Sequence, residues 1–194
     1  TRLVTPGGIS VGWPEAALTE ILLPAAGLGE LQLLWPTLAR LTSRGERIVL
    51  VAPPYIPYPQ AWQAAGVDLR WLAVIETQGR DALWAAEQCL RSGSCAAVLC
   101  WPQQADDRAL RRLQVAAEGR PVFACLWRPT VAFKAPSPAP LRVALAAGER
   151  SLSVRIVKRR GRPVSGALAV AVPCPPHSLA FAGRNPRAVA GPAF

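Results

Sequence analysis

The stretch that decides the fold covers residues 18–43 and reads LTEILLPAAGLGELQLLWPTLARLTS. It begins with an apolar run at residues 18–23, which predicts a buried strand. Small residues form a turn at 24–29, and leucines then recur every three or four positions from Leu31 to Leu41, which predicts an amphipathic helix. The stretch therefore predicts a strand, a glycine-containing loop and a helix, in that order.

A strand, a glycine loop and a helix form the unit with which P-loop proteins hold phosphates. In a working loop the last glycine precedes a lysine, which contacts the terminal phosphates, and a serine or threonine, which binds magnesium. In this chain Gly27 and Gly29 are followed by Glu30 and Leu31. A carboxylate repels a triphosphate and leucine cannot bind a metal. The loop therefore predicts a nucleotide-binding architecture that has lost its catalytic groups, and no cofactor is expected.

The composition is that of a globular protein. The chain has 194 residues, enough for one well-buried domain and an extension, and 51% of them are hydrophobic. No stretch approaches the roughly 20 apolar residues of a membrane span, and the first residues show no basic-then-apolar leader. A cytoplasmic protein without a membrane segment is expected.

The cysteine and histidine content argues against disulfides, metal sites and a catalytic triad. The five cysteines are odd in number and form no CxxC pair, which predicts free thiols in a reducing compartment. They are Cys89, Cys95, Cys100, Cys125 and Cys174. The single histidine, His177, lies far along the chain from any plausible nucleophile.

The charge is distributed unevenly along the chain. Residues 1–99 carry seven basic and eight acidic side chains, a balance of −1, whereas residues 100–194 carry fifteen basic and four acidic ones, a balance of +11. The predominance of arginine over lysine fits a coding bias, but a bias does not explain the asymmetry. The C-terminal half is therefore expected to meet a polyanion or an acidic partner.

Apolar strands alternate with amphipathic helices through most of the chain. Strands are expected at residues 18–23, 47–52, 72–75, 96–101 and 122–127, and helices at 31–41, 60–65, 81–91 and 106–118. Pro36 should kink or restart the first helix, because proline removes a backbone hydrogen bond. Continuous apolar strands that alternate with such helices predict an α/β fold, with a mostly parallel sheet covered on both faces.

The pattern changes after Arg128. A proline-rich loop at 130–140 precedes three expected strands, at 141–145, 152–157 and 168–172. Because there is no room for crossover helices between them, these strands should be antiparallel. The predicted organisation is a core at residues 1–150, a basic antiparallel extension of the same sheet at 151–172, and a proline-rich tail at 173–194.

Seven segments, in order along the chain, carry a resemblance to a known family. They are GWPEAALTEILL, GLGELQLLWPTLARL, VLVAPPYIPY, AAGVDL, DALWAAEQCLRSGSCAAVLCW, RALRRLQVAAE and VKRRGRP. Over roughly residues 7–172 the chain resembles the ATPase core of RecA-type recombinases. The resemblance is to the degenerate branch formed by the SulA-like and ImuA-like proteins of the bacterial DNA-damage response. It implies a RecA-like, P-loop-type core.

The resemblance also implies that this chain is not an ATPase. Active relatives end the second core strand with a glutamate that positions water, and here the matching residue is Pro53 or Pro54. They end the fourth strand with a magnesium-linked aspartate, and here the match is Trp101. With Glu30 in place of the lysine, all three polar requirements of ATP hydrolysis are absent.

Between the two branches, the run at 52–58 (APPYIPY) and the basic VKRRGRP hairpin favour ImuA over SulA. The ImuA resemblance implies a non-catalytic accessory protein of SOS-induced mutagenic translesion DNA synthesis, associated with the bacterial nucleoid. Its implied partners are the RecA recombinase, the Y-family-like protein ImuB and, indirectly, an error-prone replicative-type polymerase. DNA and a second copy of the chain are further candidates. The alternative is a SulA-type inhibitor of the tubulin-like cell-division GTPase. A third reading, a nucleotide hydrolase, needs a lysine or arginine from another subunit.

Basic residues supply the candidate contact surfaces. The first set is Arg155, Lys158, Arg159, Arg160 and Arg162. These five charges could neutralise DNA phosphates, dock an acidic protein groove or form a solvated hairpin tip, and the sequence leaves the three readings open. Aromatic residues are absent nearby in sequence, which argues against single-strand specificity. The second set, Arg108, Arg111 and Arg112, forms a helix face for which solvent exposure is the favoured reading.

Three aromatic residues and one lysine are weaker candidates for contact with a partner. Phe133 and Lys134 lie in the loop after the fifth core strand, where RecA-type proteins place a DNA-binding loop, but the surrounding prolines favour a rigid connector. Trp62 and Trp84 fall off the predicted buried stripes, so both are candidates for anchoring a protein interface.

Overall fold

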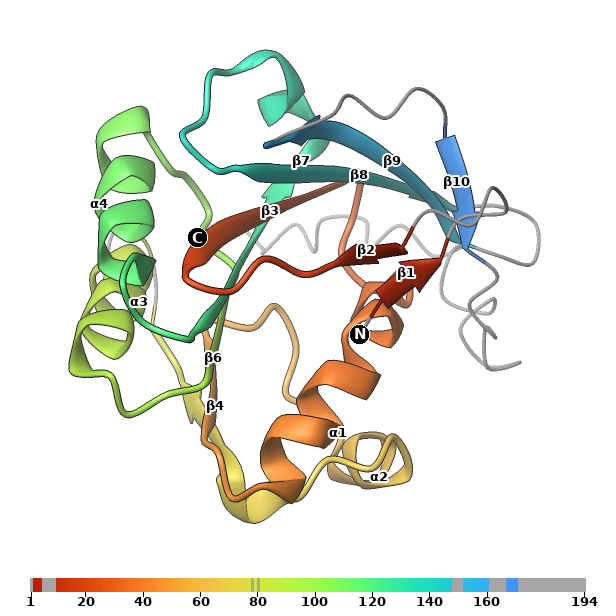
Figure 1. Cartoon of the computed structure of the whole chain (residues 1–194), viewed down its shortest axis with the longest axis vertical. Helices are drawn as coiled ribbons and strands as arrows, with labels where there is room; N and C mark the ends of the chain where they lie inside the picture. Colours follow the sequence, from red (N-terminus) through yellow and green to blue (C-terminus); the bar gives the residue numbers. More distant parts are fainter. Residues whose placement is uncertain are drawn as a thin grey trace, which may run out of the picture.

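The computed structural model describes residues 2–4, 10–77, 79, 81–147, 152–160 and 167–170 (Figure 1). The strands are β1 (Arg2–Val4), β2 (Ser10–Gly12), β3 (Ala17–Leu23), β4 (Ile48–Val51), β5 (Leu72–Ile75), β6 (Ala97–Cys100), β7 (Phe123–Pro129), β8 (Leu141–Ala147), β9 (Leu152–Arg159) and β10 (Ala167–Val170). The α-helices are α1 (Trp35–Ser43), α2 (Pro59–Ala64), α3 (Asp81–Ser92) and α4 (Asp107–Ala117), and the 3-10 helices are η1 (Glu30–Leu33), η2 (Leu69–Trp71) and η3 (Thr130–Lys134). The tail at 173–194 lies outside the described residues.

The described residues form an α/β fold around an eight-stranded mixed sheet with the order β10-β9-β8-β3-β7-β6-β4-β5. The strands from β8 to β5 in this order are all parallel, and β9 is antiparallel to both β8 and β10. The predicted α/β class and mostly parallel sheet are therefore confirmed. A separate antiparallel pair joins β1 to β2.

The prediction that the last three strands are antiparallel to one another is confirmed, but the sequence did not indicate how they join the rest of the sheet. β8 runs antiparallel to β9 but parallel to β3, with Ile21 opposite Val143. Segment 130–140 carries the chain across β3 without an α-helix, using only the short η3 and an extended stretch. A crossover of this length is enough for a parallel return, although the sequence offered no helical pattern to indicate it.

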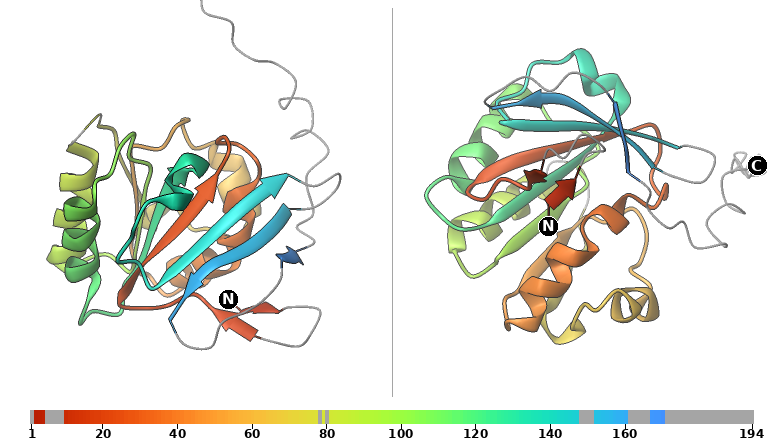
Figure 2. Two further views of the ribbon diagram at one scale, coloured as in Figure 1. Left: turned by 90° about the horizontal axis from the view of Figure 1, so that it is seen from above. Right: turned by 45° about the vertical axis from the view of Figure 1, so that its right-hand side comes forward.

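Helices cover both faces of the sheet (Figure 2). Alternate strand residues enter two separate cores. On one face Leu50 of β4 packs in the cluster that contains Leu38 of α1. On the other face its neighbour Val49 packs with Leu90 of α3 and Leu110 of α4. Successive side chains of a strand point to opposite faces of the sheet. Because both faces are covered here, the central strands need apolar residues at every position. No helix of the described residues is long and apolar enough to cross a membrane.

Pro36 determines where the first α-helix begins. Residues 30–33 form η1, and α1 begins at Trp35 with Pro36 in its first turn. The N–H groups in the first turn of a helix have no acceptor within the helix, so a proline there removes no hydrogen bond. The helix therefore restarts at the proline, as predicted. The expectation for Trp62 is wrong: the side chain is buried and packs edge-on against Trp35, with ring centroids 4.7 Å apart. α2 has only six residues, and this indole is the side chain that attaches it to α1.

Candidate functional site

The carboxyl ends of the parallel strands carry the loop that the sequence singled out. This glycine loop (residues 24–29) follows β3, and Gly27 and Gly29 adopt φ angles of 87° and 83°. Side-chain-bearing residues rarely adopt this left-handed backbone, so the turn requires both glycines. The loop leads directly into η1 through Gly29.

Glu30 closes the glycine loop from inside. Its side chain is buried, and its Oε1 accepts a hydrogen bond of 3.3 Å from the Gly27 N–H. Its Oε2 has no hydrogen-bond partner among the described residues. A carboxylate therefore already lies against a loop amide of the kind that holds a phosphate in working P-loops. The residues of this loop do not fit a nucleotide triphosphate.

The positions matched to the catalytic glutamate and aspartate hold apolar groups. Trp101 follows β6 and stacks on Trp127 of β7, with ring centroids 4.2 Å apart and an interplanar angle of 10°. Pro53 follows β4, and with Pro54 and Trp101 it lines a hollow of about 670 Å³. At the two positions that the resemblance matches to carboxylates, the structure has an indole and a pyrrolidine ring.

This hollow lies at a position that often binds ligands in α/β sheets. β4 and β6 are neighbours, but the chain leaves them for helices on opposite faces, α2 beside α1 and α4 beside α3. Such a switch point leaves a crevice at the carboxyl ends of the strands. Among the described residues that line it, Glu76 is the only charged one. None of the described lining residues would offer a cation to a phosphate.

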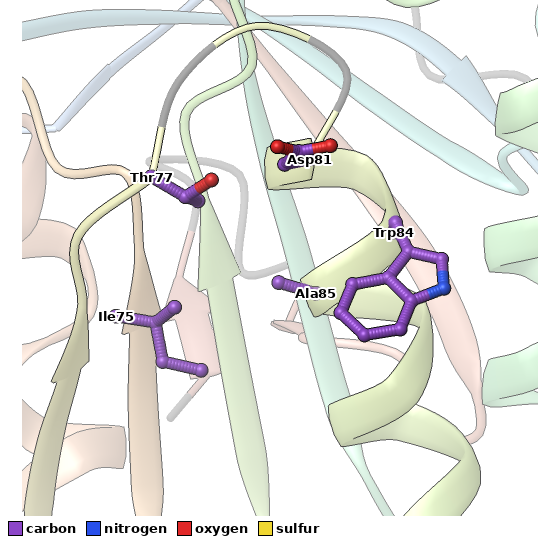
Figure 3. A pocket seen from close by; sticks show the side chains of 5 residues that line it. All are labelled: Ile75, Thr77, Asp81, Trp84 and Ala85. Carbon is purple, nitrogen blue, oxygen red and sulfur yellow. The ribbon is translucent and has the colours of Figure 1, made fainter.

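A second, shallower hollow lies at the edge of the sheet (Figure 3). Ile75 and Thr77 border it on the β5 side, and Asp81, Trp84 and Ala85 border it from the start of α3. Its volume is about 560 Å³. Trp84 is exposed, as expected from its position off the buried stripe. Its role as an interface anchor stays a prediction.

An exposed apolar loop lies beside the glycine loop. In this proline loop (residues 52–58) the side chains of Tyr55, Ile56 and Tyr58 are 68%, 88% and 65% exposed. A Cβ atom added at Gly27 would lie 3.9 Å from the Tyr55 ring, so the two loops are close neighbours. In the sequence, this run contributes to the family resemblance. Two tyrosines spaced between prolines could also have indicated a rigid binding surface, because tyrosine is enriched at interface hot spots.

The basic residues of β9 meet an aromatic residue that is distant in sequence. The Arg155 guanidinium lies 4.8 Å from the centroid of the Phe133 ring, and Lys158 donates a hydrogen bond of 2.7 Å to the Ser137 carbonyl. The expectation that no aromatic residue lies near this cluster is therefore wrong. The reason is the fold: segment 130–140 returns over β8 and β9, so η3 lies beside β9 (Figure 1).

The basic patch comprises Arg155, Lys158, Arg159 and Arg160. All but Arg159, which is half-buried, are exposed. Arg162 lies outside the described residues. The exposed Val131 and partly exposed Phe133 of η3 add apolar surface beside the patch. Guanidinium groups next to an accessible aromatic ring can bind both phosphates and bases.

A buried ion-pair cluster holds η3 in place, and the sequence analysis missed it. Glu20, in the middle of β3, is fully buried and pairs with Arg128 of β7 at 2.9 Å and Arg142 of β8 at 2.5 Å. Arg142 also donates hydrogen bonds to the carbonyls of Ala132 (2.8 Å), Phe133 (3.4 Å) and Ala135 (3.1 Å). In the sequence, Glu20 is a charged residue within an apolar strand. Since buried carboxylates are almost always paired, this position could have indicated a buried ion pair.

The arginines of α4 are mostly engaged in ion pairs. Arg111 pairs with Asp107 of the same helix at 2.7 Å, and Arg112 pairs with the buried Glu87 of α3. Arg108 is exposed and has no ion pair in the part of the chain that the structure describes. Two of the three charges are thus partly neutralised, unlike those of the basic patch.

No family model matches the chain, and no curated protein matches it. The solved structure of SulA from Pseudomonas aeruginosa is similar, at 23% sequence identity and a TM-score of 0.48, over 60% of this chain and 99% of that chain. Among the described residues, no group of three or more histidines, cysteines, aspartates or glutamates could hold a metal ion.

Proposed function

We propose that this chain is a non-catalytic, RecA-like adaptor of SOS-induced translesion DNA synthesis that binds protein partners and DNA. The observation that carries the proposal is the contact between Glu30 and the Gly27 amide, which fills the glycine loop with the chain's own carboxylate. The ImuA resemblance supplies the biological setting and the partners, the RecA recombinase and ImuB.

Two exposed surfaces support a binding role. The proline loop presents two tyrosines and an isoleucine on a backbone stiffened by prolines, so little conformational entropy is lost when a partner protein covers it. The basic patch and Phe133 present positive charge beside an aromatic ring, which suits a nucleic-acid backbone and its bases. The adaptor would thus hold a protein on one loop and a nucleic acid at β9.

The first test compares binding of the full chain to the RecA recombinase and to the tubulin-like cell-division GTPase by biolayer interferometry. Binding to the recombinase alone is expected. Triple substitution of Tyr55, Ile56 and Tyr58 by serine should weaken it at least tenfold, because exposed aromatic anchors dominate interface energy. A Val115→Ser variant, which changes an exposed apolar residue on α4, is the matched control. Binding to the GTPase alone would contradict the adaptor proposal and would support the alternative, a SulA-type inhibitor.

The second test measures binding of a fluorescent single-stranded oligonucleotide over a salt series. The double substitution Arg155→Ala with Lys158→Ala should reduce the slope of log affinity against log salt by about 1.4, because each phosphate contact with a single strand contributes about 0.7. Phe133→Ala should weaken binding without changing the slope, since stacking carries no counterion. An unchanged slope in the double variant would assign the basic patch to solvent.

A third measurement addresses catalysis directly. Isothermal titration of the chain with Mg-ATP should give no saturable heat, because Glu30 repels the phosphates. Saturable binding with magnesium-dependent turnover would overturn the non-catalytic part of the proposal.

A further inference from the structure

The hollow at the carboxyl ends of β4 and β6 borders the proline loop. Pro53 and Pro54 line this hollow and belong to the proline loop, whose next residue, Tyr55, is exposed. A protein that covers the proline loop therefore lies close to the hollow. The chemistry of the hollow thus bears on the kind of side chain that such a partner presents.

The walls of the hollow are held by hydrogen bonds between strand ends. The Ala52 N–H donates to the Ile75 carbonyl at 2.9 Å, and the backbone N–H of Trp101 donates to the Val51 carbonyl at 3.1 Å. Ala52 also adopts a φ of 51°, a left-handed backbone that residues with a side chain rarely adopt. Such positions concentrate at binding sites, where the surrounding structure enforces them. The hollow is therefore preformed, so little conformational entropy is lost when a ligand fills it.

Trp101 gives the hollow an aromatic wall. This residue lines the hollow, and its indole stacks on the buried Trp127 with an interplanar angle of 10°, which fixes the plane of the ring. Aromatic rings attract cations through the negative charge of their faces, and the flat guanidinium of arginine does so more often than the lysine ammonium. The wall therefore suits a planar cation.

The charge of the hollow is opposite in sign to that of the whole chain, which is +10. Glu76 is exposed, lines the hollow and forms no ion pair among the described residues. The shallower hollow shares Thr77 with it and adds the exposed Asp81 (Figure 3). None of the described residues that line either hollow is basic. A cation is therefore attracted to this end of the sheet, and an anion is repelled.

Neutral polar side chains add hydrogen-bond acceptors to the hollow. Gln103 and Thr77 line it together with Glu76, and their side chains carry an amide oxygen and a hydroxyl. A guanidinium has five N–H donors in a fixed plane, whereas an ammonium has three donors and is strongly hydrated. One carboxylate, one amide oxygen and one hydroxyl therefore match the donors of arginine better than those of lysine.

We propose that this hollow receives the guanidinium of an arginine side chain from the protein partner, which pairs with Glu76 and packs on Trp101. The inference rests on the proposed adaptor function and names the chemistry of its partner: an arginine next to apolar residues. The apolar residues cover Tyr55 and Ile56 of the proline loop. The arginine supplies specificity, because a carboxylate in a hollow without a described cation disfavours an acidic side chain.

The first test titrates the ¹⁵N-labelled full chain with N-acetyl-arginine amide at constant ionic strength and follows the amide signals by NMR. Saturable shifts are expected at Glu76, Thr77 and Trp101, in the millimolar range, because a single side chain offers few contacts. N-acetyl-lysine amide should bind more weakly. N-acetyl-citrulline amide, which has a similar shape but no charge, should give no saturable shift. Absence of saturation with arginine, or equal shifts with citrulline, would overturn the proposal.

Two variants that remove the same charge locate the binding. Glu76→Gln should weaken the arginine interaction on the order of tenfold, because hydrogen bonds to a charged group are the stronger ones. Glu15→Gln is the matched control: Glu15 is also exposed, but it precedes β3 whereas Glu76 follows β5, so the two lie at opposite ends of the parallel strands. The spectrum of each variant reports directly that it is folded. Equal weakening by both substitutions would mean general attraction by net charge and would overturn the proposal.

The same two variants are then measured against the recombinase by biolayer interferometry. Glu76→Gln should weaken this binding on the order of tenfold, and Glu15→Gln should leave it unchanged. If the wild-type chain and Glu76→Gln bind the recombinase equally, the inference is wrong while the adaptor proposal stands. If the wild-type chain does not bind the recombinase, the adaptor proposal is wrong in its partner, and the arginine titration still decides whether the hollow accepts a guanidinium.

Discussion

The glycine loop and the η3–β9 surface belong to one sheet but carry opposite kinds of side chain. At the glycine loop, the buried Glu30 carboxylate lies against the Gly27 amide, and after β6 the Trp101 indole stacks on Trp127. At η3 and β9, the exposed Arg155 guanidinium lies over the Phe133 ring. Among the described residues of these two regions, the accessible positive charge therefore lies at β9, whereas the glycine loop holds a buried negative charge.

The buried charge of β3 illustrates this difference. Glu20 lies on the strand that leads into the glycine loop, yet its carboxylate faces Arg142, which organises η3 through three backbone carbonyls. The ion pair thus supports the basic surface and not the glycine loop.

The largest expected effect follows from Glu20→Gln. Glutamine keeps the volume of the side chain but leaves Arg128 and Arg142 as buried cations without a counter-charge. Breaking a buried ion pair in this way costs about 3–5 kcal/mol. Urea denaturation should therefore show a lower midpoint at an unchanged slope. Oligonucleotide binding should weaken as well, because η3 loses the anchor that positions Phe133.

Glu87→Gln is the matched control for this substitution. Glu87 is also buried and also pairs with two arginines, but the side chains of Arg91 and Arg112 are 58% and 54% exposed. Water can hydrate both guanidinium groups once the carboxylate is removed, so a cost of about 1 kcal/mol is expected. Equal costs for the two glutamates would mean that the Glu20 cluster is no more shielded than the surface one.

A smaller effect is expected at the indole stack. Trp101→Ala removes the ring that covers Trp127, and loss of a half-buried aromatic stack costs about 2–3 kcal/mol in the free energy of unfolding. Trp101→Asp places a carboxylate at the position that the proposed RecA-like resemblance matches to a magnesium-linked aspartate, and should also destabilise the fold. It should not create magnesium-dependent ATP binding, because Glu30 still occupies the glycine loop. Thermal unfolding with and without Mg-ATP checks both statements, and a rise in melting temperature with Mg-ATP would contradict the second.

The local features of the fold could be predicted from the sequence. The strand at 72–75 and the helices that begin near residues 81 and 107 agree closely with the structure, because each is a short apolar run or an amphipathic repeat between turn residues. The restart at Pro36 was also predictable, since it depends on one residue and its neighbours.

The features that the sequence did not indicate depend on contacts between distant segments. The parallel pairing of β8 with β3, the burial of Trp62 against Trp35 and the position of Phe133 against Arg155 all follow from register and crossover paths. Local patterns do not contain this information. Glu20 was visible as a charge in an apolar run, but its partners lie 108 and 122 residues away along the chain.

The smallest expected effect concerns the arginines of α4, whose positive charge should not be equivalent to that of β9. Arg111 forms an exposed ion pair with Asp107 one helical turn away, and such pairs contribute about 0.3–0.5 kcal/mol. Arg111→Ala should therefore change the free energy of unfolding by no more than about 0.5 kcal/mol. The same variant should bind the oligonucleotide with an unchanged salt slope, because its neighbouring carboxylate already cancels much of the charge a phosphate would meet. Arg155→Ala, measured in parallel, removes a cation for which the structure gives no ion pair among the described residues and should lower the slope by about 0.7. If the two variants lowered affinity and slope equally, the nucleic-acid surface would extend over both α4 and β9, and positive charge alone, without the aromatic ring of Phe133, would account for binding.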